Sequence, residues 1–516
     1  MTDVTRQPAS PVAAQLARTF ALDNGRLFAV AVALSVAPLW FGSMLPLVDM
    51  PQHAAQIAAL HEMWSGNQTF LQQFEINWFT PYLLGYLLLY AIALVVPVAV
   101  ATQALATIAV GSIALLTGRL LRVAGADERW KWLAIPGSFS FCFYWGFLSF
   151  IVAAPVALLF LEQSIRYARE PTMRRAVGIA LFGIFLFFCH IIVLGLISLV
   201  ALGYVCGRHY REPKRLLAMV LPFAAPLPVI AVWLKITVAT EAVHNPVVFG
   251  PLLDRFVILA MEPAGLNTAS ALSLGLTLAI FALPPLAGAR FSRAPERWLP
   301  VLLELVVFMC APGYVLNAGF FYHRLGIFLV PLWLLAWDAP PAGKTHRLDW
   351  IGMVLVTIWL FANAGRFAAF ARESESLEPV IAAIEPGKTV AAMIYDSRSQ
   401  LFPGPVYMHF GAWYQAQRAG IVDFNFGDFY SQMVRYKKDA GPRLTEQLAW
   451  MPTAFQWAAH GGDKYDYFIV KANEDISAQL FKDKLPAVQL VGRSGWWWLY
   501  RNVERQQSST ASSGAQ

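Results

Sequence analysis

A short polar segment that follows the first long apolar run holds residue types well suited to chemistry. It reads Val48-Asp49-Met50-Pro51-Gln52-His53. Helices favour aspartate at the N-cap and proline in the first turn, so the pattern predicts a helix that begins near Asp49 and lies at the membrane interface. Asp49 and His53 are then one helical turn apart, and the pair could bind a divalent cation such as Mg²⁺ or Mn²⁺ or take a proton from a sugar hydroxyl. The alternative is that Asp49 only caps the helix and that His53 is an ordinary interfacial residue.

A second group stands at the start of a late apolar run, in Phe320-Phe321-Tyr322-His323-Arg324-Leu325. A charge in that position costs several kcal/mol if it faces lipid, so we expect Arg324 to face a cavity or an anionic group. Its planar guanidinium suits a phosphate or diphosphate. The alternative is a snorkelling arginine that anchors the helix at the headgroups.

Three further features are predicted on the same side of the membrane. His190 interrupts the apolar run 176–206 and is expected at the tip of a hairpin, either as a turn residue or as a ligand. Tyr144-Trp145-Gly146 marks another hairpin tip and has the composition of an aromatic belt. The outer loop 236–266 contains an amphipathic piece, 251–260, that is expected on the membrane surface. Such a loop either gates a lipid-facing site or is a passive connector.

The composition excludes a soluble enzyme. Of the 516 residues, 57% are hydrophobic and 14% are charged, and the mean hydropathy is +0.51. Soluble domains carry about 25% charged residues. The net charge of +7 does not indicate nucleic-acid binding, because the basic residues lie in short clusters between long apolar runs. The pattern is that of a polytopic membrane protein whose partner is the lipid bilayer.

The spans follow from the apolar runs, because a spanning helix needs about 20 mostly apolar residues. The first run, 27–47, has no cleavage site after it and predicts an uncleaved span behind an amino-terminal tail, 1–26. The stretch 80–96 is expected to lie along the outer interface or to re-enter. About eleven crossings are predicted in all, the remaining runs being 98–121, 132–149, 150–165, 176–189, 191–206, 217–235, 268–289, 298–316, 325–338 and 350–371.

Orientation follows from the excess of Lys and Arg in cytoplasmic loops. Basic clusters occur at 119–131, 166–175, 208–215, 290–297 and 344–347. All of them can face the cytoplasm only if consecutive clusters are separated by an even number of crossings. The runs 132–165 and 176–206 are therefore predicted hairpins, and 80–121 makes one net crossing. The amino terminus is then cytoplasmic and the carboxyl terminus lies outside.

The composition becomes polar and mixed after Arg372. Strand-like runs occur at 389–395 and 467–470, and a hairpin-like pair, 488–491 and 496–500, flanks the turn Gly492-Arg493-Ser494-Gly495. Residues 372–506 are therefore predicted to form a soluble extracytoplasmic α/β domain. The last residues, 507–516, are rich in Ser, Gln and Ala and are predicted to be a disordered tail.

The order of these parts resembles the GT-C superfamily of membrane glycosyltransferases, which use polyprenyl-phosphate-linked sugars. The resemblance covers most of the transmembrane module, 27–371, and is weaker across 372–506, where only the position and the α/β character of the domain agree. It is carried by an uncleaved first span, an outer loop (48–79) that opens with an acidic residue, short hairpins, and a late outer arginine. The corresponding motifs here are Val48-Asp49-Met50-Pro51-Gln52-His53, Tyr144-Trp145-Gly146-Phe147, Cys189-His190 and Tyr322-His323-Arg324-Leu325.

The resemblance implies transfer of a sugar from a polyprenyl phosphate to an acceptor glycan, lipid or protein on the outer face of the membrane. Asp49, with His53 beside it, would orient or deprotonate the acceptor hydroxyl, and Arg324, with His323 and His190, would bind the donor phosphate. Members that bind metal tightly usually add a second acidic pair on another outer loop, and the hairpin tip here carries no carboxylate. A divalent cation would therefore depend on Asp49 and His53. The implied location is the inner (plasma) membrane of a bacterium, with the carboxyl-terminal domain in the periplasm or outside the cell.

Other classes of membrane protein remain as alternatives. A transporter or flippase of lipid-linked saccharides needs ionisable groups at mid-membrane and broken helices in matched halves. The spans here are nearly free of charge at their centres, with Glu304 and Arg366 as the main exceptions. A polysaccharide polymerase or a membrane-bound acyltransferase is a further alternative; the latter normally pairs an embedded histidine with a nearby Asn or Asp, which His190 lacks. A purely structural or assembly role is the last. Release of polyprenyl phosphate from a lipid-linked sugar distinguishes the first hypothesis from all of these.

Overall fold

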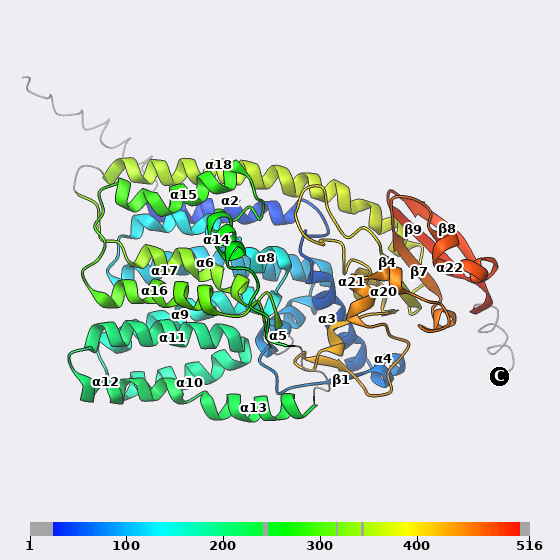
Figure 1. Cartoon of the computed structure of the whole chain (residues 1–516), viewed down its shortest axis with the longest axis horizontal. Coiled ribbons are helices and arrows are strands. Elements are labelled where there is room, and N and C mark those ends of the chain that lie inside the picture. The colour runs from blue at the N-terminus through cyan, green and yellow to red at the C-terminus, as the bar shows by residue number, and fades with distance from the viewer. Residues whose placement is uncertain (1–23, 241–245, 316–317, 342–344, 506–516) are drawn as a thin grey trace, which may run out of the picture.

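The computed structural model describes residues 24–240, 246–315, 318–341 and 345–505. Helices lie side by side over the left and centre of Figure 1, and a sheet-containing carboxyl-terminal region lies at the right-hand end. The helix α18 (Thr345–Ser374) runs along the top of the bundle towards that region. The expected tail 507–516 and residues 1–23 of the expected amino-terminal tail lie outside the described residues.

The bundle contains several helices that are long and apolar enough to cross a membrane, which makes the chain an integral membrane protein. Within the described ranges these are Val98–Ala124, Leu148–Arg169, Ile191–His209 and Trp350–Ala382. A bent pair, Pro213–Ala224 and Leu227–Thr237, makes a fifth span if its two halves, which meet at 41°, are taken together. Shorter apolar helices accompany them at Gly25–Trp40, Leu83–Ala93, Ala271–Leu286 and Tyr322–Leu335. The predicted membrane protein is confirmed, whereas the expected count of about eleven crossings is not.

Most of the predicted runs correspond to helices with similar bounds. The bundle helices are α2 (Asn24–Val36), α5 (Leu83–Ala93), α6 (Val98–Ala124), α9 (Leu148–Arg169), α10 (Met173–Cys189), α11 (Ile191–His209), α12 (Pro213–Val220), α13 (Leu227–Thr240), α15 (Ala271–Leu286), α16 (Pro295–Cys310) and α17 (Leu329–Leu335). Helix α5 has 11 residues and is about 16 Å long, which is too short to cross the hydrocarbon core. This length agrees with the expectation that 80–96 does not make a full crossing.

The expected span 132–149 is wrong as a continuous helix. The chain there forms short pieces, η2 (Glu128–Leu133), α7 (Ala134–Gly137) and α8 (Phe141–Trp145). The breaks between them expose backbone groups that must find partners inside the protein, as when the amide of Phe141 donates to the carboxylate of Glu262 at 3.0 Å. Irregular backbone at such depth is tolerated only where protein surrounds it. Hydropathy therefore found an apolar segment but could not tell a spanning helix from a buried, broken one.

Ion pairs connect the basic clusters that were assigned to one side of the membrane. Arg119 of α6 and Arg166 of α9 both bind Glu162, at 2.6 and 3.0 Å. Arg208 at the end of α11 pairs with Glu296 at the start of α16 at 3.2 Å. The basic ends of these helices are thus at the same end of the bundle, as the charge pattern requires.

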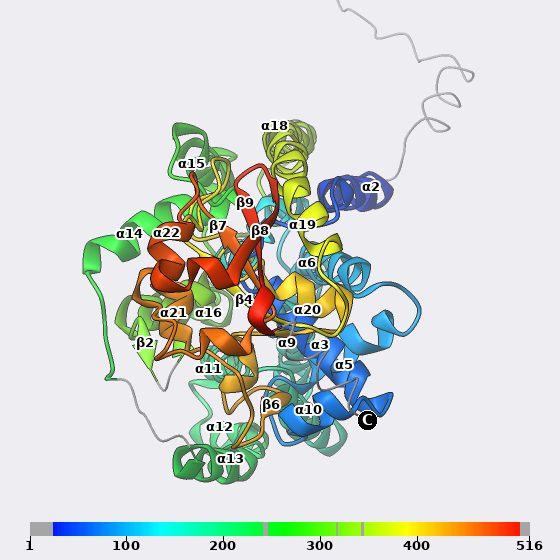
Figure 2. The same ribbon diagram turned by 90° about the vertical axis from the view of Figure 1, so that its right-hand side faces the viewer.

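The carboxyl-terminal region contains a five-stranded sheet of order β5-β4-β7-β9-β8. The strand β4 is parallel to β5 and β7, and β9 is antiparallel to β7 and β8. The strands predicted from the sequence are confirmed, but Gly492 to Ser494 of the predicted turn belong to β8. Gly495 lies at the tip of the β8–β9 hairpin in the left-handed conformation (φ +58°). Figure 2 shows the sheet in front of the bundle when the molecule is viewed along the helices. The strands are β4 (Thr389–Ile394), β5 (Ile421–Val422), β7 (Tyr467–Lys471), β8 (Val488–Ser494) and β9 (Trp497–Asn502).

The helix α3 (Met50–Trp64) lies between the bundle and this region, and protein encloses most of it. Its place at the membrane interface stays a prediction. Its side chains from Met50 to Leu60 are buried, and α20 (Ala412–Arg418) packs on it. Gln52 and Gln56, one turn apart, carry out the docking through their side-chain amides. Gln52 bonds the backbone of Phe424 and Phe426 at 3.2 and 3.0 Å. Gln56 bonds both the carbonyl and the amide of Val434, at 2.9 and 3.1 Å.

A small antiparallel ladder extends the same interface. The strand β1 (Phe74–Ile76), from the outer loop 48–79, pairs with β6 (Val434–Tyr436), so Glu75 lies opposite Arg435. These two side chains form an ion pair at 2.9 Å. The first outer loop and the carboxyl-terminal region are therefore joined by backbone, amide and charge contacts. The interface therefore positions the side chains at the amino-terminal end of α3 against the carboxyl-terminal region.

Candidate active site

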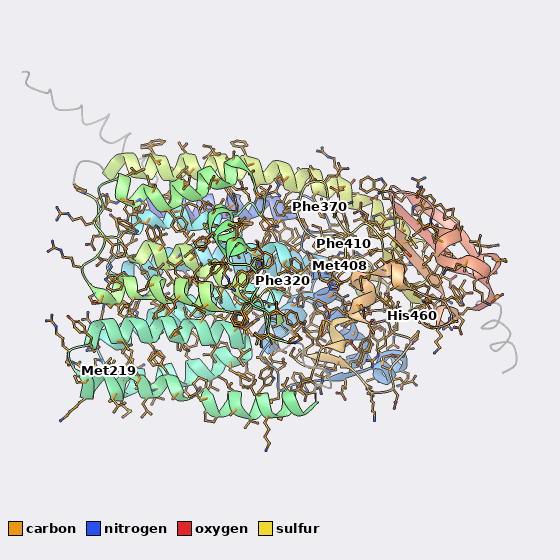
Figure 3. All side chains as sticks on the ribbon, in the orientation of Figure 1. Met219, Phe320, Phe370, Met408, Phe410 and His460 are labelled. Atoms are coloured by element: carbon orange, nitrogen blue, oxygen red, sulfur yellow. The ribbon has the colours of Figure 1, made fainter. Side chains whose placement is uncertain are left out.

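A cavity of about 580 Å³ lies at the amino-terminal end of α3. Its wall includes Asp49, His53, His190, His323 and Arg324, which come from distant parts of the sequence. The structure therefore brings together the five residues that the sequence predicted for the site. Figure 3 labels two further lining residues, Phe320 and Met408, near the junction between the bundle and the carboxyl-terminal region.

Asp49 occupies the N-cap position of α3, but its carboxylate does not cap the helix. No hydrogen bond runs from a backbone amide of the first turn to its side chain, and only its backbone carbonyl accepts from Gln52 and His53. Asp49 is 6% exposed. Burial raises the pKa of this carboxyl, and the positive charge of Arg324 lowers it. The Asp49 side chain thus lies in the cavity wall and does not serve as a cap for α3.

The hairpin tip at Trp145 and Gly146 fixes the backbone position of Asp49. The amide of Asp49 donates to the carbonyl of Trp145 at 2.9 Å. Gly146 has a φ of +82°, and a Cβ atom added to it would lie 3.0 Å from the backbone nitrogens of both Asp49 and Met50. Only glycine adopts this conformation without strain and lets the backbone of α3 approach so closely. The tip expected to be an aromatic belt therefore forms part of the site.

The ring of His53 is held by the surrounding protein. Its Nδ1 and the hydroxyl oxygen of Tyr86 lie 2.8 Å apart, the same oxygen lies 2.5 Å from the side-chain carbonyl oxygen of Gln432, and the ring bonds the backbone of Gly146. Burial lowers the pKa of His53 to about 3. The imidazole is therefore neutral near pH 7 and both of its nitrogens face fixed partners. This arrangement fits a supporting residue better than a base.

The expected cation site finds no matching set of ligands. Across the described parts of the chain, no group of three or more His, Cys, Asp and Glu side chains is placed to hold a metal ion. Of the two residues proposed to bind one, His53 is already engaged by Tyr86 and Gly146. The pair therefore does not fit a dedicated metal site. Metal dependence stays an untested prediction.

Arg324 lies in the cavity wall and is not an extended anchor at the surface. Its Nε and Nη2 donate to the carbonyl of Gly319 at 3.1 and 2.9 Å, and its guanidinium stacks over the ring of Phe147 at 3.6 Å. Gly319 belongs to the hairpin of β2 (Tyr314–Val315) and β3 (Ala318–Gly319). Since a guanidinium has five N–H donors, the Nη1 group and one hydrogen of Nη2 remain for an anion. Among the described residues, no ion pair joins Arg324 to Asp49 or to any other carboxylate.

The two remaining histidines line the cavity in different ways. His190 caps α11, because its Nδ1 accepts the amide of Ile192 at 3.2 Å, which leaves the proton on Nε2. Its ring lies between Tyr82 and Phe150. His323 stacks on Tyr322 with 4.2 Å between ring centroids, and its buried Nδ1 has no hydrogen-bond partner within the described structure. His190 is therefore both the expected turn residue and part of the cavity wall.

The outer loop 236–266 also contributes to the cavity. The predicted amphipathic piece forms α14 (Leu252–Met261), whose apolar side chains are exposed. Arg255 holds this helix in place, because its guanidinium donates to three backbone carbonyls and stacks over Tyr322 at 4.0 Å. Gly250, Pro251 and Asp254 line the cavity. Glu241 and His244 of the same loop lie outside the described residues.

Sequence reasoning missed the contribution of the carboxyl-terminal region to the site. His409, Gln432, Glu446 and Trp450 all line the cavity. Glu446 and Trp450 come from α21 (Glu446–Trp450), one helical turn apart. His409 and its neighbour Gln52 are 357 residues apart in the chain, so no local pattern joins them. The aromatic-rich stretch around His409, Val406 to Tyr414, is the only signal in the sequence, and it does not reveal what the histidine faces.

The chain was compared with protein families, curated proteins and solved structures, and it is similar in fold to solved structures. No protein-family model matches the chain, and no curated protein matches it. Among solved structures it is similar to ArnT from Cupriavidus metallidurans bound to undecaprenyl phosphate, with a TM-score of 0.53 and 12% identity over 92% of this chain and 97% of that one. The apo state of the same ArnT gives a TM-score of 0.51 at 12% identity, over 96% and 99% of the two chains.

The chain has the same overall fold as ArnT. The resemblance predicted from the order of spans, outer loop and carboxyl-terminal region is thereby confirmed as a similarity of fold. Because the match covers more than nine-tenths of both chains, it includes most of the carboxyl-terminal region as well. Fold alone does not assign an activity, which must come from the site.

Proposed function

We propose that the protein is a membrane glycosyltransferase that moves a sugar from a polyprenyl phosphate to an acceptor hydroxyl. The observation that supports this most is one cavity containing a carboxylate not used for capping, Asp49, and an arginine without a carboxylate partner in the described structure, Arg324. Transfer from a phosphate leaving group needs an acceptor for one proton and a donor to a developing negative charge. A solved protein of the same fold was crystallised with undecaprenyl phosphate.

The acceptor side of the reaction is assigned to Asp49. The acceptor hydroxyl gives its proton to the Asp49 carboxylate as its oxygen forms the new bond to the anomeric carbon of the donor sugar. General-base help of this kind contributes about 10²–10⁴-fold to rate. His53 keeps a supporting role, because its ring is fixed between Tyr86 and Gly146 below the carboxylate.

The donor side is assigned to Arg324. The bond between the anomeric carbon and the phosphate oxygen breaks, and the polyprenyl phosphate leaves with the electron pair. The free Nη1 edge of Arg324 and the Nε2–H of His190 donate to the phosphate oxygens, and His323 lies beside them in the wall. Charge-assisted hydrogen bonds from a preorganised site are worth more than those in water.

The same proposal includes the location of the reaction. With the basic helix ends in the cytoplasm, the cavity and the carboxyl-terminal region face the outer side, which is the periplasm if the membrane is a bacterial inner membrane. A lipid donor suits such a site, because its prenyl tail stays in the bilayer while its phosphate reaches the cavity. The acceptor is a glycan, a lipid or a protein that approaches from outside.

The decisive test is turnover by purified protein in lipid vesicles. Polyprenyl-phosphate sugars are supplied with candidate acceptors, and the released polyprenyl phosphate and the glycosylated product are both measured. Equal amounts of the two products support the transferase. Movement of intact lipid-linked sugar across the vesicle membrane, with no release of polyprenyl phosphate, would instead identify a flippase and overturn the proposal.

A further inference from the structure

The proposed active site contains a buried histidine from the carboxyl-terminal region that has no assigned role. His409 is 6% exposed, and its Nε2 lies 3.7 Å from Oδ1 of Asp49. Its ring packs against Phe424 and Phe426. His409 thus brings a side chain of the carboxyl-terminal region beside the Asp49 carboxylate.

The neighbouring glutamine determines which nitrogen of His409 carries the proton. The carbonyl oxygen of the Gln52 side chain accepts the amide of Phe426 at 3.0 Å, and its Nε2 donates to the carbonyl of Phe424 at 3.2 Å. A flipped amide would face donor to donor and acceptor to acceptor, so the orientation of Gln52 is fixed. The same Nε2 lies 3.5 Å from Nδ1 of His409. Because an amide nitrogen only donates, Nδ1 must accept, and the proton of the neutral ring is on Nε2, towards Asp49.

We propose that His409 is a positioning residue that holds Asp49 by donating its Nε2–H to Oδ1. This inference rests on the proposed function. The distance of 3.7 Å is longer than a hydrogen bond, but such contacts in unliganded sites commonly shorten when substrate binds. With Oδ1 held, the other oxygen of Asp49 is the one that accepts the proton of the acceptor hydroxyl. Gln52 thereby connects the docking of the carboxyl-terminal region to the geometry of the base.

The chief competing role for His409 is that of the base itself, with Asp49 holding the imidazole. The two roles require the proton on different nitrogens of the His409 ring. A base must present an unprotonated nitrogen to the acceptor, whereas the Gln52 network places the unprotonated Nδ1 against an amide and the protonated Nε2 against a carboxylate. The geometry therefore favours positioning, and substitutions can separate the two roles.

Two amide substitutions differ in the atom that they replace. In His409→Gln the amide nitrogen falls near the place of Nε2 and can still donate to Asp49. In His409→Asn the side chain is shorter and reaches only the place of Nδ1, and His409→Ala removes both groups. We expect His409→Gln to lose less than about threefold in kcat, and the Asn and Ala variants to lose about ten- to a hundredfold, the range of one hydrogen bond to a charged group. The KM for the polyprenyl-phosphate sugar should not change in any of them.

The matched control is His460→Ala in the same region. His460 bonds only Gln456 in the described structure, and Figure 3 shows it far from Met408, the chain neighbour of His409. This variant should turn over like the wild type. Thermal unfolding of all variants shows whether a loss of kcat reflects a loss of folded protein.

Three outcomes would overturn the inference. If His409→Gln is as inactive as His409→Ala while both are folded, His409 is the base. If all three variants turn over like the wild type, Asp49 does not need the contact. A parallel rise in the donor KM would show a binding role instead. Failure of the wild type to release polyprenyl phosphate would remove the proposed function, and the inference with it, before any variant is compared.

Discussion

At the scale of single residues, Asp49 and Arg324 could each have a purely structural role, as a helix cap and as a membrane anchor, and the structure tests both roles. An N-cap aspartate normally uses an oxygen to accept a backbone amide, and Asp49 does not. A snorkelling arginine extends towards headgroups, whereas Arg324 is held under Phe147 by the Gly319 carbonyl in the cavity wall. Both side chains are thus free of the structural tasks that their sequence positions suggested.

Asp49→Asn isolates the charge of this residue. Asparagine is nearly the same size, and the Asp49 side chain makes no capping hydrogen bond that could be lost, so the variant should unfold at the temperature of the wild type. If Asp49 accepts the proton of the acceptor hydroxyl, turnover should fall by at least about 10²-fold. The measurement is initial-rate release of polyprenyl phosphate. Full activity in this folded variant would rule out the catalytic role.

Arg324→Lys separates charge from shape. A lysine ammonium cannot keep the Gly319 carbonyl bonded and also present a second donor edge, so donor binding should weaken by about 1–2 kcal/mol. Arg324→Ala should abolish turnover while the protein still folds. Donor affinity can be measured by titration with a polyprenyl-phosphate sugar. Arg398→Lys, an exposed arginine paired with Asp396, is the control that should change neither quantity.

At the scale of elements, the beginning of α3 is set by its neighbours. The hairpin tip at Gly146 supplies a carbonyl and a close backbone contact on one side. On the other side, Gln52 and Gln56 fasten the helix to the carboxyl-terminal region. Because the helix is held by contacts on both sides, the residue at its start, Asp49, has a fixed position. A group that transfers a proton needs such a fixed position.

Gly146→Ala should move that first residue. The new methyl group would press on the amides of Asp49 and Met50 at 3.0 Å, and an alanine at positive φ costs about 1–2 kcal/mol in addition. We expect a lower unfolding temperature and a kcat loss of about tenfold or more, since small misplacements of reacting groups cost about 10²-fold. Gly195→Ala in α11 is the matched control, because nothing lies within 4 Å of its added Cβ. Equal kcat in the two variants would show that the reaction does not depend on the exact position of the Asp49 backbone.

At the scale of the whole molecule, the arrangement predicts which parts of the chain face outward. Arg119, Arg166 and Arg208 lie at helix ends joined by ion pairs, and the sheet of the carboxyl-terminal region is at the other end of the bundle. By the excess of basic residues in cytoplasmic loops, the sheet is outside. This orientation remains a prediction.

Cysteine labelling in intact cells tests it. Lys438→Cys, at an exposed position of the carboxyl-terminal region, should react with a membrane-impermeant thiol reagent. Arg211→Cys, exposed at the opposite end, should react only after the membrane is permeabilised. The wild-type chain, with its four native cysteines, gives the background. The reverse labelling pattern would invert the topology and move the proposed reaction to the cytoplasmic face.

The sequence by itself determined the class of protein, most helix bounds and the strands β4, β7, β8 and β9. Apolar runs and strand alternation are local patterns, and burial in lipid or in a sheet acts on them directly. It also identified Asp49 and Arg324, because a charged group beside a long apolar run needs a special reason to be there. Those inferences needed no knowledge of distant contacts.

Only the tertiary structure decided how the site is assembled. It showed that the run 132–149 is a broken, buried segment, that α3 is enclosed, and that the ring of His53 is already engaged. It also brought His409 to Asp49 across the chain. Each of these outcomes depends on which segments pack together, and hydropathy along one segment does not report its neighbours. Contacts between residues more than 350 positions apart form only when the carboxyl-terminal region docks on α3, and that docking fixes the geometry around Asp49.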